Sequence, residues 1–289
     1  MKNVLTKQRS VARIVPSMQT LEGGGVLIHR AFPIPAIGEI DPFLLLDHMG
    51  PLEMAPGEQT GFPEHPHRGF ETVTYLLEGE MEHKDSFGHR GLLSPGDVQW
   101  MTAGSGLVHS EMPSAGFIQK GGRLEGFQLW VNLPQRDKMM EPRYQELASA
   151  SIPVGQNEDG SVRVRVIAGE AFGKEARIET RIPIFYLHYT LQPGASVEVA
   201  APVELNAFAY IIKGESQFAK ERQLAVFAKD GDSIALENPS SSQPLDALVI
   251  GGRPLGEPVA RYGPFVMNTK AELAQAFEDY RLGRMGRIR

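Results

Sequence analysis

Two short motifs contain four side chains that could ligate a metal ion. The triplet His-Pro-His at 65–67 places two imidazoles two positions apart, and His-Ser-Glu at 109–111 repeats this spacing with an imidazole and a carboxylate. Side chains on a strand alternate between its two faces, so residues two apart share a face. Two such segments lying side by side could offer all four ligands to one point. The spacing therefore predicts a divalent metal site formed by His65, His67, His109 and Glu111.

The donor set limits the metal without fixing it. Three imidazoles with one carboxylate suit iron, nickel, copper, zinc, manganese or cobalt as the divalent ion. The chain has no cysteine, which excludes thiolate sites and disulfides. Pro66 lacks an N–H, so its segment is expected at the start or edge of a strand. The alternative is that these are surface or pocket histidines that bind no metal.

The elements around these motifs have the texture of strands. Short apolar runs rich in Val, Ile, Tyr, Phe and Thr alternate with turns of Gly, Pro, Asp and Asn, which predicts a barrel or sandwich made mainly of strands. Six of these runs lie at 72–77, 127–132, 163–167, 184–191, 207–212 and 247–250. Helical spacing is concentrated near the end, where Thr269 is the expected N-cap and Gly283 the expected stop.

The two halves of the chain resemble each other. TYLLEGE at 74–80 can be laid over AYIIKGE at 209–215, and the same offset of 135 residues places the turn at 95–97 on the turn at 230–232. This similarity indicates an internal duplication. If the alignment stays gapless, the three histidines fall on Ala200, Pro202 and Pro244, and Glu111 falls on Asp246. The second half would then keep the scaffold without the site.

Composition excludes several classes of partner. A formal net charge of −6 over 289 residues argues against direct binding to nucleic acid. The first residues lack the apolar stretch of a signal peptide, and no apolar run is long enough to span a membrane. We expect a cytoplasmic protein, or a nuclear one in a eukaryote, and a monomer.

Longer motifs resemble the pirins, which are two-domain members of the cupin superfamily (bicupins). The segments are HPHRGFETVTYLLEGEMEH at 65–83, SPGDVQWMTAGSGLVHSEMP at 94–113, FQLWVNLP at 127–134, YQELAS at 144–149 and GPFVMNT at 263–269. The resemblance implies a mainly β fold with two tandem cupin-type antiparallel β-barrels, that is, double-stranded β-helices, and a C-terminal α-helix. We expect a metal-binding barrel at 1–140 and a barrel without ligands, with the helix, at 141–289. The polar segment 136–147 is expected to connect them.

The pirin resemblance also implies a chemistry. It makes Fe²⁺ the expected cofactor and assigns the carboxylate ligand to Glu111, although the general cupin pattern would place a glutamate at Glu71. Several pirins resemble flavonol dioxygenases, which cleave quercetin with O₂ and release carbon monoxide. The substrate would be a small aromatic flavonol, and Glu111 would accept the proton of its 3-hydroxyl.

The alternative implied by the resemblance is a redox-sensing, metal-dependent regulator that binds a protein partner without turnover. Arg68, next to His67, could carry such a signal or form a structural salt bridge. Among the other histidines, His83 and His89 flank a polar turn and are expected to be solvated, whereas His48 could approach the pocket.

Overall fold

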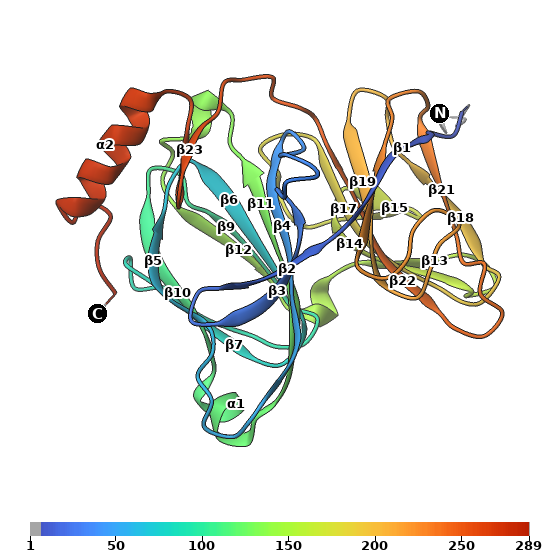
Figure 1. Cartoon of the computed structure of the whole chain (residues 1–289), viewed down its shortest axis with the longest axis horizontal. Coiled ribbons are helices and arrows are strands. Elements are labelled where there is room, and N and C mark those ends of the chain that lie inside the picture. Colours follow the sequence, from blue (N-terminus) through green and yellow to red (C-terminus); the bar gives the residue numbers. More distant parts are fainter. Residues whose placement is uncertain (1–6, 289) are drawn as a thin grey trace. The chain divides into compact units, whose positions relative to one another are not determined.

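The computed structural model describes residues 7–288, and strands dominate this part of the chain (Figure 1). The chain forms two compact units, each of them a cupin-type barrel. The first barrel comprises Gln19–Arg30, Pro42–Ser149 and residues 255–288. The second barrel comprises residues 7–18, Ala31–Asp41 and Ala150–Pro254. The predicted fold class, two tandem cupin barrels with a C-terminal helix, is confirmed.

The first barrel contains a seven-stranded sheet and a four-stranded sheet. The large sheet has the order β12-β9-β6-β11-β4-β3-β2 and the small one β5-β10-β7-β8. The strands of the large sheet are β2 Met18–Glu22, β3 Val26–Phe32, β4 Phe43–Met54, β6 Phe70–Glu78, β9 Val98–Thr102, β11 Gly122–Asn132 and β12 Arg143–Leu147. Those of the small sheet are β5 Phe62–His67, β7 Met81–Asp85, β8 Arg90–Leu93 and β10 Leu107–Pro113. The remaining elements are α1 Ala115–Lys120, the pair β23 Ala260–Tyr262 and β24 Phe265–Met267, and α2 Lys270–Arg281.

The second barrel also contains a seven-stranded sheet, in the order β1-β20-β19-β22-β17-β14-β13. Its strands are β1 Val11–Pro16, β13 Val154–Gln156, β14 Val162–Ala168, β17 Ile184–Leu191, β19 Asn206–Lys213, β20 Gln223–Phe227 and β22 Leu245–Gly252. Two pairs complete it: β18 Ser196–Ala200 with β21 Ser233–Glu237, and β15 Glu170–Ala171 with β16 Lys174–Glu175. Short 3₁₀ turns lie at Gln135–Asp137 and Ser149–Ser151.

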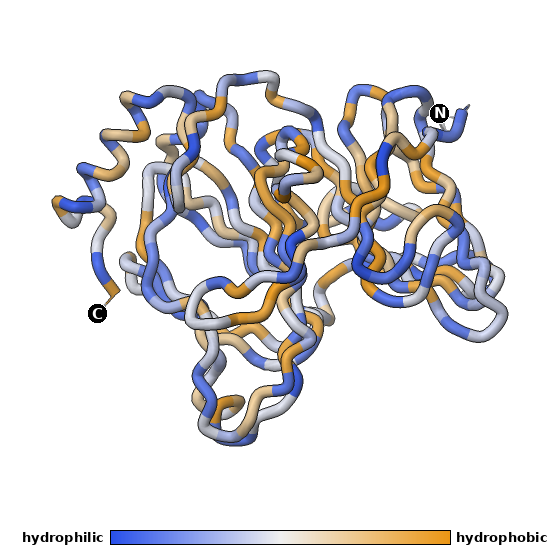
Figure 2. Tube along the Cα trace, in the orientation of Figure 1, coloured by the Kyte–Doolittle hydropathy of each residue, from blue (hydrophilic) through white to orange (hydrophobic). Residues whose placement is uncertain are grey.

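The apolar runs of the sequence become the strands that enclose each core. All six predicted runs lie on strands, namely β6, β11, β14, β17, β19 and β22. In the second barrel, Leu187, Tyr189 and Leu191 on β17 pack with Val199 on β18 and Ile234 on β21. The apolar segments in Figure 2 follow the strands accordingly, while many connecting loops are hydrophilic. Alternate residues of both sheets thus bury one shared core.

The contiguous division at residue 140 differs from the compact units that the structure shows. Strand β1 pairs with β20 of the second barrel, with Val15 opposite Leu224. At the other end of the chain, Phe265, Ala276 and Met285 pack on Val108 of the first barrel. Each barrel therefore takes a terminal segment from the opposite end of the chain. The predicted connection at 136–147 is wrong in part, because 143–147 forms β12 at the edge of the first barrel's large sheet.

The duplication is visible in the sheets, but the gapless alignment is wrong beyond its first landmark. In both large sheets, five strands follow the same order: β9-β6-β11-β4-β3 corresponds to β20-β19-β22-β17-β14. The turn at 95–97 precedes β9, whereas the turn at 230–232 precedes β21 and not β20. The second half is shorter in this region. Ala200 lies opposite Ser233, in the way that His65 lies opposite His109, so the second barrel has no imidazole at either equivalent position.

The C-terminal helix begins and ends where the sequence predicts. The Thr269 hydroxyl accepts from the Glu272 N–H, and the Glu272 carboxylate accepts from the Thr269 N–H, which forms a capping box. Ala276 and Asp279 are the buried residues of α2. Within residues 7–288, no helix combines the length and apolar character needed to cross a bilayer.

Candidate metal centre

Strand pairing brings the two predicted motifs together. Strand β5 lies at the edge of the small sheet and pairs antiparallel with β10, so that His65 lies directly opposite His109. The edge position suits Pro66, as predicted. Strand alternation then turns His67 to the same face as His65. The tight turn at 104–106, with positive φ at Gly104 and Gly106, leads the chain into β10.

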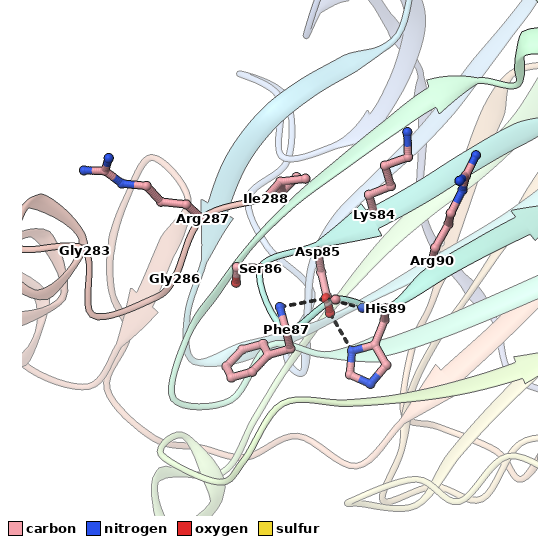
Figure 3. Close-up of a pocket in the computed structure, with 11 residues that line it drawn as sticks. Lys84, Asp85, Ser86, Phe87, His89, Arg90, Gly283, Gly286, Arg287 and Ile288 are labelled. Carbon is pink, nitrogen blue, oxygen red and sulfur yellow. Dashed lines mark hydrogen bonds and ion pairs between the residues drawn. The ribbon is translucent and has the colours of Figure 1, made fainter.

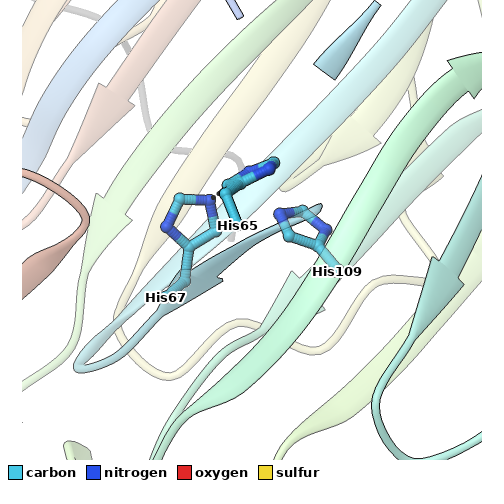
Figure 4. A group of neighbouring side chains, drawn as sticks. All are labelled: His65, His67 and His109. Atoms are coloured by element: carbon cyan, nitrogen blue, oxygen red, sulfur yellow. Dashed lines mark hydrogen bonds between the residues drawn. The ribbon is translucent and has the colours of Figure 1, made fainter. Parts of the chain in front are cut away.

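The three imidazoles form one cluster (Figure 4). The ring centroids of His65 and His67 are 4.7 Å apart, and those of His65 and His109 are 4.3 Å apart. One nitrogen of each ring lies within 4.8 Å of the other two. His67 and His109 are buried, while His65 is half-buried. Among residues 7–288, no comparable cluster of three histidine or carboxylate ligands lies in the second barrel.

The outer nitrogen of each ring is held by a hydrogen bond. The Nδ1 atom of His65 lies 2.7 Å from the Pro63 carbonyl, and that of His67 lies 3.4 Å from the Pro264 carbonyl. A carbonyl can only accept, so both Nδ1 atoms carry the proton. In the neutral imidazoles, Nε2 then carries a lone pair that faces the centre of the cluster. Metal-binding histidines are typically held in this way.

The inner nitrogens have the arrangement that a cation would satisfy. The Nε2 atoms of His65 and His67 are 3.1 Å apart, so their lone pairs repel unless a metal ion or a shared proton lies between them. The Nε2 atom of His109 is buried and has no hydrogen-bond partner. Burial, followed by the neighbouring imidazoles, lowers the pKa of His67 and of His109 well below the usual value. Neutral imidazoles with inward lone pairs fit a divalent metal ion.

The Glu111 carboxylate is near this cluster but outside it. The pairing of β10 with β5 shifts register between His109 and Glu111. The carboxylate accepts from the Thr74 hydroxyl at 2.8 Å and from the Gln128 amide at 3.2 Å. It is buried and lines the same cavity as His65 and His67. The structure thus brings three of the four predicted ligands together, and Glu111 as the fourth ligand stays a prediction.

Glu71, the alternative carboxylate, is buried outside the cluster. Its Oε1 atom accepts a hydrogen bond from the Thr102 hydroxyl at 2.6 Å. His48, which could have approached the pocket, has its Nε2 atom 2.9 Å from Glu125 Oε1 and is not part of the cavity wall.

A cavity of about 540 Å³ adjoins the cluster. Its wall is partly apolar, with Leu45, Met49 and Phe62, and partly charged. Trp130 packs edge-on against His67 at 5.1 Å, and the Arg261 guanidinium lies 4.9 Å from the centre of the Trp130 ring. The cavity therefore offers both apolar and cationic surface next to the imidazoles.

His83 lies in a different environment from the one that the sequence analysis predicted. The prediction that it is solvated is wrong, because it is 1% exposed and its Nε2 atom lies 3.1 Å from Nδ1 of His109. Its strand carried a signal, since Met81, His83 and Asp85 alternate with two charged residues. That period of two predicts a buried face. His89, in contrast, has a largely exposed side chain, as predicted.

Arg68 forms the structural salt bridge that was one of its two predicted roles. Its Nη1 atom lies 2.8 Å from the Asp279 carboxylate of α2, and its Nε donates to the Ser105 carbonyl. Burial would raise the pKa of Asp279, but hydrogen bonds from Arg68, Gln275 and Arg284 outweigh it and lower the pKa to about 2. The residue after His67 is thus tied to the C-terminal helix.

Comparison with known proteins places both barrels in one family. The family model described as pirin matches residues 25–131, and the model described as pirin C-terminal cupin domain matches residues 186–286. A pirin-like protein of Solanum lycopersicum is 45% identical over 99% of this chain and 96% of its own length. Human pirin is 43% identical over 96% of this chain and 94% of its own length.

Solved structures agree with the sequence comparison. A crystal structure named quercetin 2,3-dioxygenase from Acinetobacter baumannii superposes with a TM-score of 0.92 at 35% identity, covering 98% of this chain and all of that one. A bacterial pirin from Escherichia coli in complex with nickel(II) shares the fold, with a TM-score of 0.63 at 20% identity over 84% of this chain and 99% of that one.

Proposed function

Because the chain belongs to the pirin family, we propose that it is a mononuclear iron protein with flavonol dioxygenase activity of the quercetin 2,3-dioxygenase type. The observation that carries this proposal is the convergence of three imidazole nitrogens beside a cavity of about 540 Å³ that Glu111 also lines. The strong structural likeness to a protein named quercetin 2,3-dioxygenase supports it. His65, His67 and His109 would hold the ion, with Glu111 as the fourth ligand after a local movement of its carboxylate.

Bound Fe²⁺ would supply open coordination positions where a substrate oxygen and dioxygen can meet, and would make the substrate hydroxyl more acidic. The reaction needs no external reductant. The flavonol gains both atoms of O₂ and loses one carbon with its oxygen as carbon monoxide, so atoms and electrons balance.

The residues of the chain would bind the substrate and move its proton. Glu111 lines the cavity beside the imidazoles, so its carboxylate would be the group that accepts the proton of the flavonol 3-hydroxyl. Phe62 and Met49 offer apolar surface to the flat rings, and Arg261 above Trp130 offers a cation to a phenolate oxygen. These contacts would hold the reacting carbon against the three imidazoles.

Turnover by wild-type protein tests the proposal directly. Apoprotein is reconstituted with Fe²⁺ under argon and exposed to air with a panel of flavonols, while flavonol absorbance and carbon monoxide are recorded. We expect both consumption and carbon monoxide with wild type, and neither with His67→Ala. Glu111→Gln keeps the side-chain shape and tests the proton acceptor. Iron-loaded protein that consumes no flavonol and releases no carbon monoxide would rule the activity out.

A second candidate, a redox-sensing regulator, is favoured by the link between Arg68 and Asp279. The residue next to His67 is joined by a buried ion pair to α2, so a change at the ion could reach a helix of the same barrel. Comparing the proteins retained by ferrous and by ferric protein tests this role. A partner retained in one oxidation state, without turnover, would favour regulation over catalysis.

A further inference from the structure

The imidazole of His109 is held from behind by another side chain instead of by the backbone. Strand β7 pairs with β10 so that His83 lies opposite Glu111 and Asp85 lies opposite His109. This places Nε2 of His83 3.1 Å from Nδ1 of His109, with the ring centroids 5.2 Å apart. Both rings are 1% exposed, so solvent does not provide an alternative partner.

This contact decides which nitrogen of His109 can bind a cation. A neutral imidazole carries one proton, and Nε2 offers a lone pair to the cluster only when the proton is on Nδ1. For His65 and His67 a backbone carbonyl fixes the proton on Nδ1, because a carbonyl only accepts. For His109 the partner is an imidazole nitrogen, which can accept or donate. Its tautomer therefore depends on the state of His83.

A third ring competes for the same atom of His83. The Tyr144 hydroxyl lies 3.2 Å from His83 Nε2, and the two ring centroids are 4.9 Å apart. If the hydroxyl donates, it occupies the lone pair of His83 Nε2. If it accepts, it requires a proton on that nitrogen. In either orientation, this contact opposes a hydrogen bond donated by His109.

The Tyr144 side chain is in turn held in place by Asp85. Its hydroxyl donates to the Asp85 carboxylate, which can only accept, so the phenol oxygen is left to accept from His83 Nε2. Asp85 in turn accepts from the backbone N–H groups of Phe87 and His89, both at 2.9 Å, and lies 3.0 Å from Nδ1 of His89 (Figure 3). A fixed carboxylate holds the phenol in position against His83.

We propose that His83 is a positioning residue that selects the metal-binding tautomer of His109, and that Tyr144 opposes this selection by competing for His83 Nε2. The inference rests on the metal site proposed above. It predicts effects of opposite sign for two neighbouring residues that do not touch the ion. Removing the acceptor on His83 weakens metal binding, and removing the competing hydroxyl strengthens it.

Titration of apoprotein with Co²⁺ tests both effects, because its visible absorption reports the ligands as well as the affinity. His83→Leu is expected to raise the Kd about 10- to 100-fold, the usual loss for a partner that orients a metal ligand. His83→Gln keeps a side-chain carbonyl that can accept from His109 Nδ1, so it should restore most of the affinity. Tyr144→Phe should lower the Kd. The absorption bands of bound Co²⁺ should keep their positions, since the ligands are unchanged.

A readout of the tautomer itself makes the test independent of affinity. Long-range ¹H–¹⁵N spectra of the metal-free proteins should show a larger fraction of His109 protonated at Nδ1 in wild type than in His83→Leu. His188→Gln, a histidine of the second barrel, is the control for loss of an imidazole. If His83→Leu binds Co²⁺ as tightly as wild type, or Tyr144→Phe weakens binding as His83→Leu does, this inference is overturned alone. Wild type that binds no Co²⁺ would overturn the metal centre and this inference with it.

Discussion

Replacing Lys138 with methionine should change how the stability of the protein depends on alkaline pH. The Lys138 side chain is fully buried. Its ammonium donates to the Gly69 carbonyl at 2.7 Å, the Asn132 side chain at 2.6 Å and the Val266 carbonyl at 3.0 Å. These acceptors belong to the loop after His67, the end of β11 and β24. The Lys138 side chain thus joins the loop that follows His67 to strand β24.

The size of the effect follows from the pKa of Lys138. Burial lowers this pKa from 10.5 to about 8, and the nearby carboxylates of Glu257 and Glu272 offset only part of the shift. Between these two values the unfolded chain binds more protons than the folded one, so stability rises with pH. At about 1.4 kcal/mol per pH unit, the gap corresponds to roughly 3 kcal/mol. This contribution is absent below about pH 8 and complete above about pH 10.5.

Urea denaturation of wild type and Lys138→Met, at steps from neutral pH to about pH 10.5, measures this contribution of Lys138 to stability. The free energy of unfolding of wild type minus that of Lys138→Met should rise by roughly 3 kcal/mol across this range. Taking this difference cancels the effect of tyrosine ionisation on the free energy of unfolding, because both proteins contain the same tyrosines. Lys120→Met, at an exposed position, controls for the loss of a lysine charge. A difference that stays constant from neutral to alkaline pH would refute the reasoning.

Three further predictions concern the metal site and its supports. Co²⁺ at about 100 times its Kd should raise the free energy of unfolding of wild type, measured by urea denaturation, by about 2.7 kcal/mol. His67→Ala should lose this stabilisation, and the control His188→Gln should keep it. Asp279→Asn should destabilise the first barrel by about 3 kcal/mol, because it leaves the buried Arg68 guanidinium without its carboxylate. Amide hydrogen exchange in α2 should become faster in this variant. Equal exchange in α2 of both proteins would count against that ion pair. Gly69→Ala should lower the melting temperature, because Gly69 has a φ of +87° and an added Cβ would lie 1.9 Å from the carbonyl oxygen of Val266 in β24; an unchanged melting temperature would contradict this.

Strand period and ligand spacing were sufficient to predict much of the fold and the three histidines of the cluster. Alternation along a strand is a local property, so the spacing of His65 and His67 predicted a shared face that the structure confirms. The same holds for the apolar runs, which each lie on a strand. The capping box of α2 is also local, since it needs only Thr269 and Glu272.

The features that the sequence did not reveal depend on residues that are distant in the chain. The environment of His83 depends on pairing with β10 and on Tyr144, which lies 61 residues away in the chain. Adjacent residues also do not reveal that Thr74 and Gln128 hold the Glu111 carboxylate, whose role as the fourth ligand stays a prediction. A uniform offset between the two halves could not reveal that the second half is shorter between β19 and β21. The exchange of terminal segments between the barrels left no local signal either.

That exchange sets the order in which the barrels can be completed on a ribosome. Every segment of the second barrel has been synthesised once residue 254 is made, whereas the first barrel still lacks residues 255–288. Those residues supply the Pro264 carbonyl behind His67 and the Asp279 carboxylate to Arg68. About 100 residues of the second barrel are synthesised before them, which takes on the order of 5–20 seconds. The first barrel, most of which is made before residue 150, is thus completed last, and a fragment ending at residue 140 would contain the histidines without their final supports.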